Sequence, residues 1–95
     1  MRKQNGRFET LHARKYLQQL GKHFAHKVEV SFSETCCCVS FPFGQATISA
    51  NETSLDVSLS GETEEALSKG RSVMDSHLKR FAFREAFEEM EWQDL

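Results

Sequence analysis

Five residues able to exchange protons or hydrogen bonds recur at regular intervals near the start of the chain. They are His12, Tyr16, Gln19, His23 and His26, spaced four, three, four and three residues apart. On an α-helix with about 100° per residue, these spacings place all five within an arc of about 80°, provided that the helix reaches His26. Histidine changes charge near neutral pH, and each of these side chains can donate or accept a hydrogen bond. The spacing predicts a polar stripe along one flank of a helix.

This stripe has three interpretations. Histidine and tyrosine often cover the boundary between core and solvent, which is the simplest explanation. The stripe could instead bind an anion or a polar small molecule. We predict no metal site, because no Asp or Glu shares the stripe and His12 lies too far along the helix from His26 to share one ion.

His77, the fourth histidine, lies on the apolar face of a second predicted helix. A lone histidine in such a place is most often a core residue that bonds to the backbone. Alternatively, it faces the stripe across a helix–helix contact, which would gather His23 or His26, His77 and Arg80 or Arg84. Such a cluster would lower histidine pKa values by mutual repulsion, or bind an anion that relieves the repulsion.

The three cysteines are consecutive, Cys36, Cys37 and Cys38. On a strand, the first and third point to one face and the second to the other. There is no CxxC pair and no histidine at zinc-finger spacing, so we interpret the cysteines as small core hydrophobes. A Cys–His nucleophile is a weaker alternative, since nothing marks an activating environment. A secreted disulfide framework would space its cysteines, so the run predicts a reducing cytoplasm.

Two helices must position these groups. The first is predicted over about residues 11–25, with Thr10 as its N-cap. The second is predicted over about residues 62–83, with Ser60 and Gly61 as its cap and acidic residues in its first turn. The predicted apolar faces are Ala13, Leu17, Leu20 and Phe24 in the first helix, and Ala66, Gly70, Val73, Met74, His77, Leu78 and Phe81 in the second.

Between the helices, short segments alternate with a period of two. They cover residues 28–32, 36–41, 45–50 and 55–59, and their short connections favour an antiparallel four-stranded meander. The connection Phe41-Pro42-Phe43-Gly44 is either a tight turn with two core anchors or the aromatic rim of a pocket. Arg7–Glu9 and Glu89–Trp92 are expected to add short terminal edge strands. The predicted fold is one α+β domain over residues 1–95, a two-layer sandwich with both helices on one face of the sheet.

Composition excludes several classes of protein. A formal net charge of −2 argues against a nucleic-acid binder. No apolar run approaches the ~18–20 residues that span a bilayer, and no hydrophobic segment follows the basic start of the chain. We therefore expect a cytoplasmic protein with no nucleic-acid or membrane partner. A 95-residue domain has a small core, so a homodimer is a further expectation.

Four segments of the chain resemble a bacterial family. They are His12–Leu20, Lys22–Lys27, Phe41–Gly44 and Ser76–Glu85, and their order and spacing are similar to those of domain of unknown function 2218. The resemblance spans nearly the whole chain, although family members commonly carry other residues at the three cysteines. The family motifs include His12, Arg14, His23, His26, Lys27, His77, Arg80 and Arg84. With Tyr16 of the stripe, these are the candidate ligand-binding residues.

The family has no assigned activity, so the resemblance implies only a context. Related domains are attached to, or encoded near, siderophore-interacting flavin reductases, which implies a role around iron acquisition with such a reductase as partner. The leading hypothesis is an accessory or binding module whose His/Arg/Lys-lined pocket takes an anionic ligand, such as a ferric chelate or a carboxylate metabolite. The alternatives are a small enzyme of siderophore-iron metabolism, with His23, His26 or His77 as general acid or base, and a purely structural or oligomerising protein. We expect no cofactor, because no cofactor motif is present.

Overall fold

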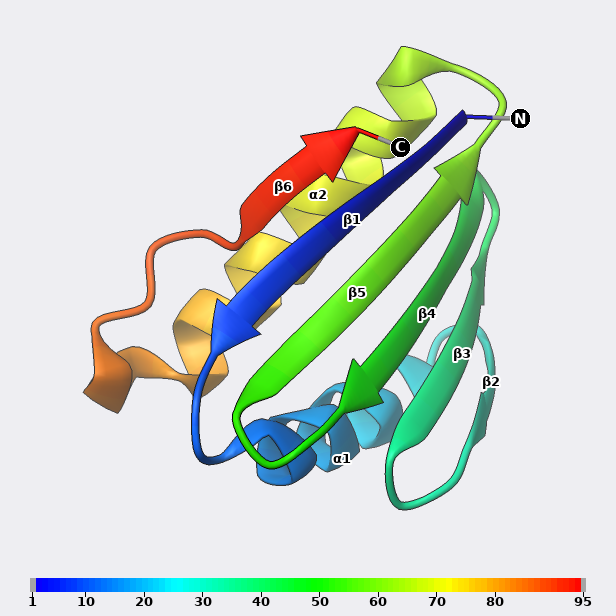
Figure 1. The fold of residues 1–95 in the computed structure, drawn as a ribbon. Coiled ribbons are helices and arrows are strands. Elements are labelled where there is room, and N and C mark those ends of the chain that lie inside the picture. Colours follow the sequence, from blue (N-terminus) through cyan, green and yellow to red (C-terminus); the bar gives the residue numbers. More distant parts are fainter. Residues whose placement is uncertain (1, 95) are drawn as a thin grey trace.

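A computed structural model describes residues 2–94, apart from the side chain of Phe32, as one antiparallel sheet with both helices on the same face (Figure 1). The strands lie in the order β2-β3-β4-β5-β1-β6. Their bounds are Arg2–Glu9 (β1), Glu29–Phe32 (β2), Cys36–Phe41 (β3), Gly44–Ala50 (β4), Ser54–Gly61 (β5) and Glu91–Asp94 (β6). The helices are α1 (Ala13–Ala25) and α2 (Glu64–Phe81), and a short 3₁₀ turn, η1 (Phe83–Glu85), follows α2. The predicted two-layer α+β fold and its meander, β2 to β5, are confirmed.

The first strand differs from the prediction. Instead of a short edge strand, β1 has eight residues and lies between β5 and β6, paired with β5 along its whole length. The sequence signal was weak because two of its helix-facing positions are Gln4 and Gly6, which are not large apolar residues. The last strand is an edge strand as expected, but it starts at Glu91 rather than Glu89.

The last strand is held by a tryptophan that lies over a glycine. Gly6 of β1 pairs with Trp92 of β6, and a Cβ atom at Gly6 would lie 2.7 Å from the indole ring. The indole Nε1 donates to Asp75 Oδ2 of α2 at 2.9 Å, and the Met90 backbone amide donates to Asp75 Oδ1 at 3.0 Å. The Asp75 carboxylate of α2 and the absence of a side chain at Gly6 thus determine where β6 adds to the sheet.

Both predicted helix starts were wrong by a few residues. α1 begins at Ala13 with His12 as its N-cap, and Thr10 lies outside the helix, where its hydroxyl accepts from the His12 amide at 3.1 Å. α2 begins at Glu64 with Thr63 as its N-cap, because the Thr63 hydroxyl accepts from the Ala66 amide at 3.1 Å. The residues expected to cap α2 instead complete β5. None of the helices within residues 2–94 is long and apolar enough to cross a membrane.

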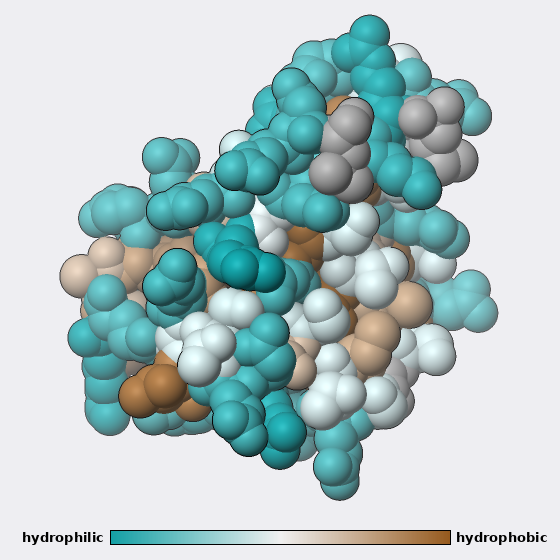
Figure 2. All heavy atoms as spheres, in the orientation of Figure 1, coloured by the Kyte–Doolittle hydropathy of each residue, from teal (hydrophilic) through white to brown (hydrophobic). Residues whose placement is uncertain are grey.

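The core lies between the helices and one face of the sheet. The predicted apolar face of α1 is buried, and Leu67 joins the buried residues of α2 although the sequence analysis missed it. The interpretation of the cysteines is wrong for two of the three. Cys37 is fully buried, but Cys36 is half-buried and Cys38 is exposed, both on the open face of the sheet. That face carries mostly polar residues (Figure 2).

The hairpin between β3 and β4 is a tight turn, as one alternative predicted, and Phe41, Pro42, Phe43 and Gly44 also line a hollow of about 670 Å³, as the other did. The rings of Phe41 and Phe43 stack with centroids 5.0 Å apart, and Phe41 packs against the core. Gly44 begins β4 directly against β5. A Cβ atom there would lie 2.2 Å from the Ser60 carbonyl oxygen, which belongs to the backbone and cannot rotate away.

We therefore predict that Gly44→Ala destabilises the protein by about 1–3 kcal/mol, the usual range for overpacking. Urea denaturation would measure the change in unfolding free energy. Gln45→Ala, at the adjacent exposed position, is the control and should have little effect. Equal stability of the two variants would contradict the close packing at Gly44.

Candidate functional site

The two helices bring His23 of α1 and His77 of α2 into contact. Their Nε2 atoms are 3.0 Å apart. His77 Nδ1 also lies 2.6 Å from the carbonyl oxygen of Val73, one turn earlier in α2. The rings of Phe24 and Phe81 flank His23, with centroids 5.6 and 6.0 Å away. Both interpretations of His77 are therefore realised, since it bonds to the backbone and also faces the stripe.

These contacts assign the protons of the neutral pair. A carbonyl oxygen only accepts, so His77 Nδ1 carries a proton and its Nε2 is an acceptor. His23 must then donate from Nε2, which leaves a lone pair on its Nδ1. A proton added at His23 Nδ1 leaves the hydrogen bond intact, whereas a second proton would place hydrogens on both facing nitrogens. The pair can therefore take up one proton, and no more, without losing the hydrogen bond between the two rings.

Positive charge surrounds His23. Its pKa is lowered first by burial and then by the charge that neighbouring basic side chains carry when protonated, in the order His77, Lys27, Arg80 and His26. Each neighbouring charge that acts on the ring thus has the same sign. A site of this kind favours neutral histidine when empty, and an anion would relieve the repulsion.

The N-terminal part of the stripe belongs to a separate cluster. The buried Tyr16 hydroxyl donates to the carboxylate of Glu85, and the Thr10 hydroxyl bonds to the same carboxylate at 2.8 and 2.9 Å. Burial, and then the Glu85 carboxylate, raise the pKa of Tyr16 to about 12. Tyr16 is therefore a neutral structural donor that ties η1 to the start of α1. Sequence reasoning missed the role of Glu85, because nothing local links residues 69 positions apart.

The other candidate residues lie at the start of α1, at the end of α1 and in η1 after α2. His12 is exposed beside Tyr16, with ring centroids 6.3 Å apart, and with Arg14 it lines a shallow hollow of about 320 Å³. The Arg84 guanidinium lies 5.6 Å from the centre of the Phe83 ring, in η1 rather than in the second helix. His26 is the C-cap of α1 and is exposed. Of the predicted set, the structure brings His23 and His77 into contact, and the charges of Lys27, Arg80 and His26 act on the pKa of His23.

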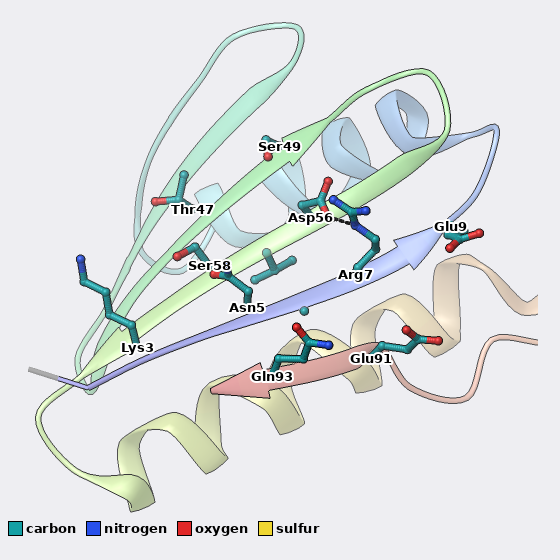
Figure 3. A pocket seen from close by; sticks show the side chains of 12 residues that line it. Lys3, Asn5, Arg7, Glu9, Thr47, Ser49, Asp56, Ser58, Glu91 and Gln93 are labelled. Carbon is teal, nitrogen blue, oxygen red and sulfur yellow. Dashed lines mark hydrogen bonds and ion pairs between the residues drawn. The ribbon is translucent and has the colours of Figure 1, made fainter. Parts of the chain in front are cut away.

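A larger hollow of about 810 Å³ lies on the open face of the sheet (Figure 3). Its lining residues come from β1, β4, β5 and β6 and are mostly polar: Lys3, Asn5, Gly6, Arg7, Glu9, Thr47, Ser49, Asp56, Val57, Ser58, Glu91 and Gln93. None of them was predicted to be a site residue, because alternate polar residues on a strand are typical of any solvent-facing sheet. The Arg7 guanidinium pairs with Asp56 at 2.7 Å, so its charge is largely balanced. The histidine pair is the stronger candidate site.

Comparison with known proteins supports the resemblance drawn from the sequence. Residues 5–93 match the model of a family described as an uncharacterized protein conserved in bacteria (DUF2218). The chain belongs to this family. The NMR structure of PA4090 from Pseudomonas aeruginosa is similar, with a TM-score of 0.83 and 27% sequence identity over 98% of this chain and 96% of that one. No curated protein matches. Family membership and fold are thus established, and the function must be argued from the site.

Tyr16→Phe should lower the free energy of unfolding by about 0.5–1.5 kcal/mol, because it removes a partly buried hydrogen bond to the Glu85 carboxylate. Urea denaturation measures this loss. Glu88→Gln is a suitable control, since Glu88 is exposed and, within residues 2–94, pairs only with the exposed Lys79. A Tyr16→Phe variant as stable as this control would show that the bond to Glu85 is not structural.

The lowered pKa of His23 predicts that stability falls in mild acid. The stability that comes from keeping His23 neutral is fully present above about pH 6.5, the ordinary histidine pKa that applies in the unfolded chain. This stability is lost as the pH falls through the lower pKa of His23 in the folded state. Denaturation curves between pH 5 and pH 8 would measure the decline. His23→Gln should flatten it, whereas His12→Gln, which leaves the pair intact, should keep it. Identical pH profiles for wild type and His23→Gln would refute the prediction.

Proposed function

We propose that this protein is a cytoplasmic binding module that takes a small anionic ligand at the His23–His77 pair. The observation that carries the proposal is the 3.0 Å contact between two histidines in surroundings where every neighbouring charge acting on His23 is positive. Uncompensated positive charge at a partly buried point is unfavourable for the empty protein. The same arrangement favours a negative ligand.

The charged side chains of Arg80 and Lys27 would attract the anionic ligand. Both are exposed, and neither makes an ion pair with another of residues 2–94. A guanidinium can bind a carboxylate through two parallel hydrogen bonds. A bound anion would raise the pKa of His23, so its Nδ1 would take up a proton while the hydrogen bond to His77 is kept. Ligand binding should therefore be coupled to the uptake of one proton.

The chemical class of ligand follows from these donors. A carboxylate suits a guanidinium, an ammonium group and an imidazolium together, and many ferric chelates present carboxylates at their surface. The resemblance to domains found near siderophore-interacting flavin reductases supports a ferric chelate as the ligand and such a reductase as a partner.

An NMR titration with citrate and ferric citrate tests the proposal. We expect saturable shifts of the His23 and His77 ring signals with citrate, and tighter binding at pH 6 than at pH 8. Arg80→Gln should weaken binding about tenfold or more, the equivalent of one charge-assisted hydrogen bond. Arg14→Gln removes the same charge near the far end of α1 and should have little effect. Equal losses in both variants, or no shift of the histidine signals, would overturn the proposal.

The second candidate is a small enzyme, and one observation favours it. The bond from His77 to the Val73 carbonyl fixes the orientation of the ring, as the partner of a general base often does. Transfer of iron from ferric citrate to an added competing chelator with multiple turnovers, lost in His23→Gln, would favour this candidate. Stoichiometric binding without turnover would favour the binding module.

A further inference from the structure

Two thiols lie on the open face of the sheet, on the side opposite the helices. In β3, the pleat directs Cys37 into the core and leaves Cys36 and Cys38 on the other face. Cys38 is exposed and Cys36 is half-buried, and all three cysteines are free thiols. Neither open-face thiol packs as a core residue, so their presence is not explained by the fold.

The spacing of the two thiols suits one small ion. Residues two apart on a strand are separated by roughly 6.6 Å. A metal ion bound linearly between two sulfurs needs them two metal–sulfur bonds apart, which is roughly 4–5 Å on the scale of the zinc–thiolate bond of about 2.3 Å. Ordinary side-chain rotation closes this difference if the two thiols lean towards each other.

The surroundings leave room for that movement. The register partner of Cys36 on β4 is Ser49, and that of Cys38 is Thr47. The Cys38 Sγ atom is 4.0 Å from the Thr47 Oγ1 atom. Both neighbours are small hydroxyl residues that line the hollow drawn in Figure 3, so no large side chain covers the thiols from β4.

The number of available ligands selects the kind of metal. Within residues 2–94, no group of three or more His, Cys, Asp or Glu side chains is placed to hold an ion. Zinc and iron–sulfur sites take four protein ligands, or three with an open position, so a pair of thiols does not suit them. Cys37 cannot add a third ligand, because it faces the core and burial raises the pKa of its thiol to about 11.

We propose that Cys36 and Cys38 form a two-thiolate site on the open face that binds one soft monovalent metal ion of the Cu⁺ class. Thiolate ligands prefer such soft ions. Binding forms two metal–sulfur bonds and releases one proton from each thiol, and it needs no oxidant or reductant. The sheet separates this site from the histidine pair, so the test of the metal site does not depend on the proposed anion site.

The test is an anaerobic titration of the reduced protein with Cu⁺, supplied as its acetonitrile complex, in competition with bicinchoninate. We expect one tightly bound Cu⁺ per monomeric chain and the release of two protons per ion. Cys36→Ser and Cys38→Ser should each abolish competition with the chelator. Cys37→Val and Cys37→Ala keep both open-face thiols, and whichever of them is folded by circular dichroism should bind like wild type.

Three outcomes would overturn the proposal. One is no competition with bicinchoninate by the folded wild-type protein. Another is binding that survives in either single serine variant, which would show that two thiolates are not required. The third is half an equivalent of Cu⁺ per chain with a dimer on size-exclusion chromatography, which would mean that Cys38 of two molecules shares the ion.

Discussion

The packing of both helices on one face of a single sheet is the constraint on which the rest of this structure depends. Two amphipathic helices that share one apolar surface must meet each other along their flanks, where side chains are only partly buried. The polar stripe of α1 lies on such a flank. Its histidine near the C-terminal end of α1 therefore meets α2 rather than solvent, and a histidine pair results.

The two polar clusters along this helix contact differ in how well their groups are satisfied. Around Glu85, a carboxylate accepts from Tyr16 and Thr10, so each group has a partner and the cluster fixes the chain after α2. Around His23, the neighbouring groups that act on the ring are all basic, and none of the described carboxylates is among them. A cluster whose charges and hydrogen bonds are balanced stabilises the fold. A cluster of like charges is destabilising until a ligand of opposite charge binds, and this relief favours binding.

The sheet separates the molecule into two chemically different sides. Alternation along β3 sends one cysteine into the core and two to the open face, and the same alternation gives that face its hydroxyl and amide residues. The covered side therefore presents cations at the helix contact, and the open side presents thiols beside small hydroxyl groups. Chemistry at one side does not require groups from the other.

The sequence by itself determined the local periodicities and the family. The four-stranded meander, the apolar face of α1 and the opposite directions of adjacent cysteines follow from backbone geometry that repeats every two or 3.6 residues. The sequence did not determine that β1 lies inside the sheet. The glycine at position 6 leaves room for the ring of Trp92 on the neighbouring strand β6, and that contact joins residues far apart in the chain. The contact of His23 with His77, 54 positions apart, was one of several arrangements consistent with spacing. Only the tertiary structure decided among them, since the distance between two helix faces depends on the summed packing of the whole core.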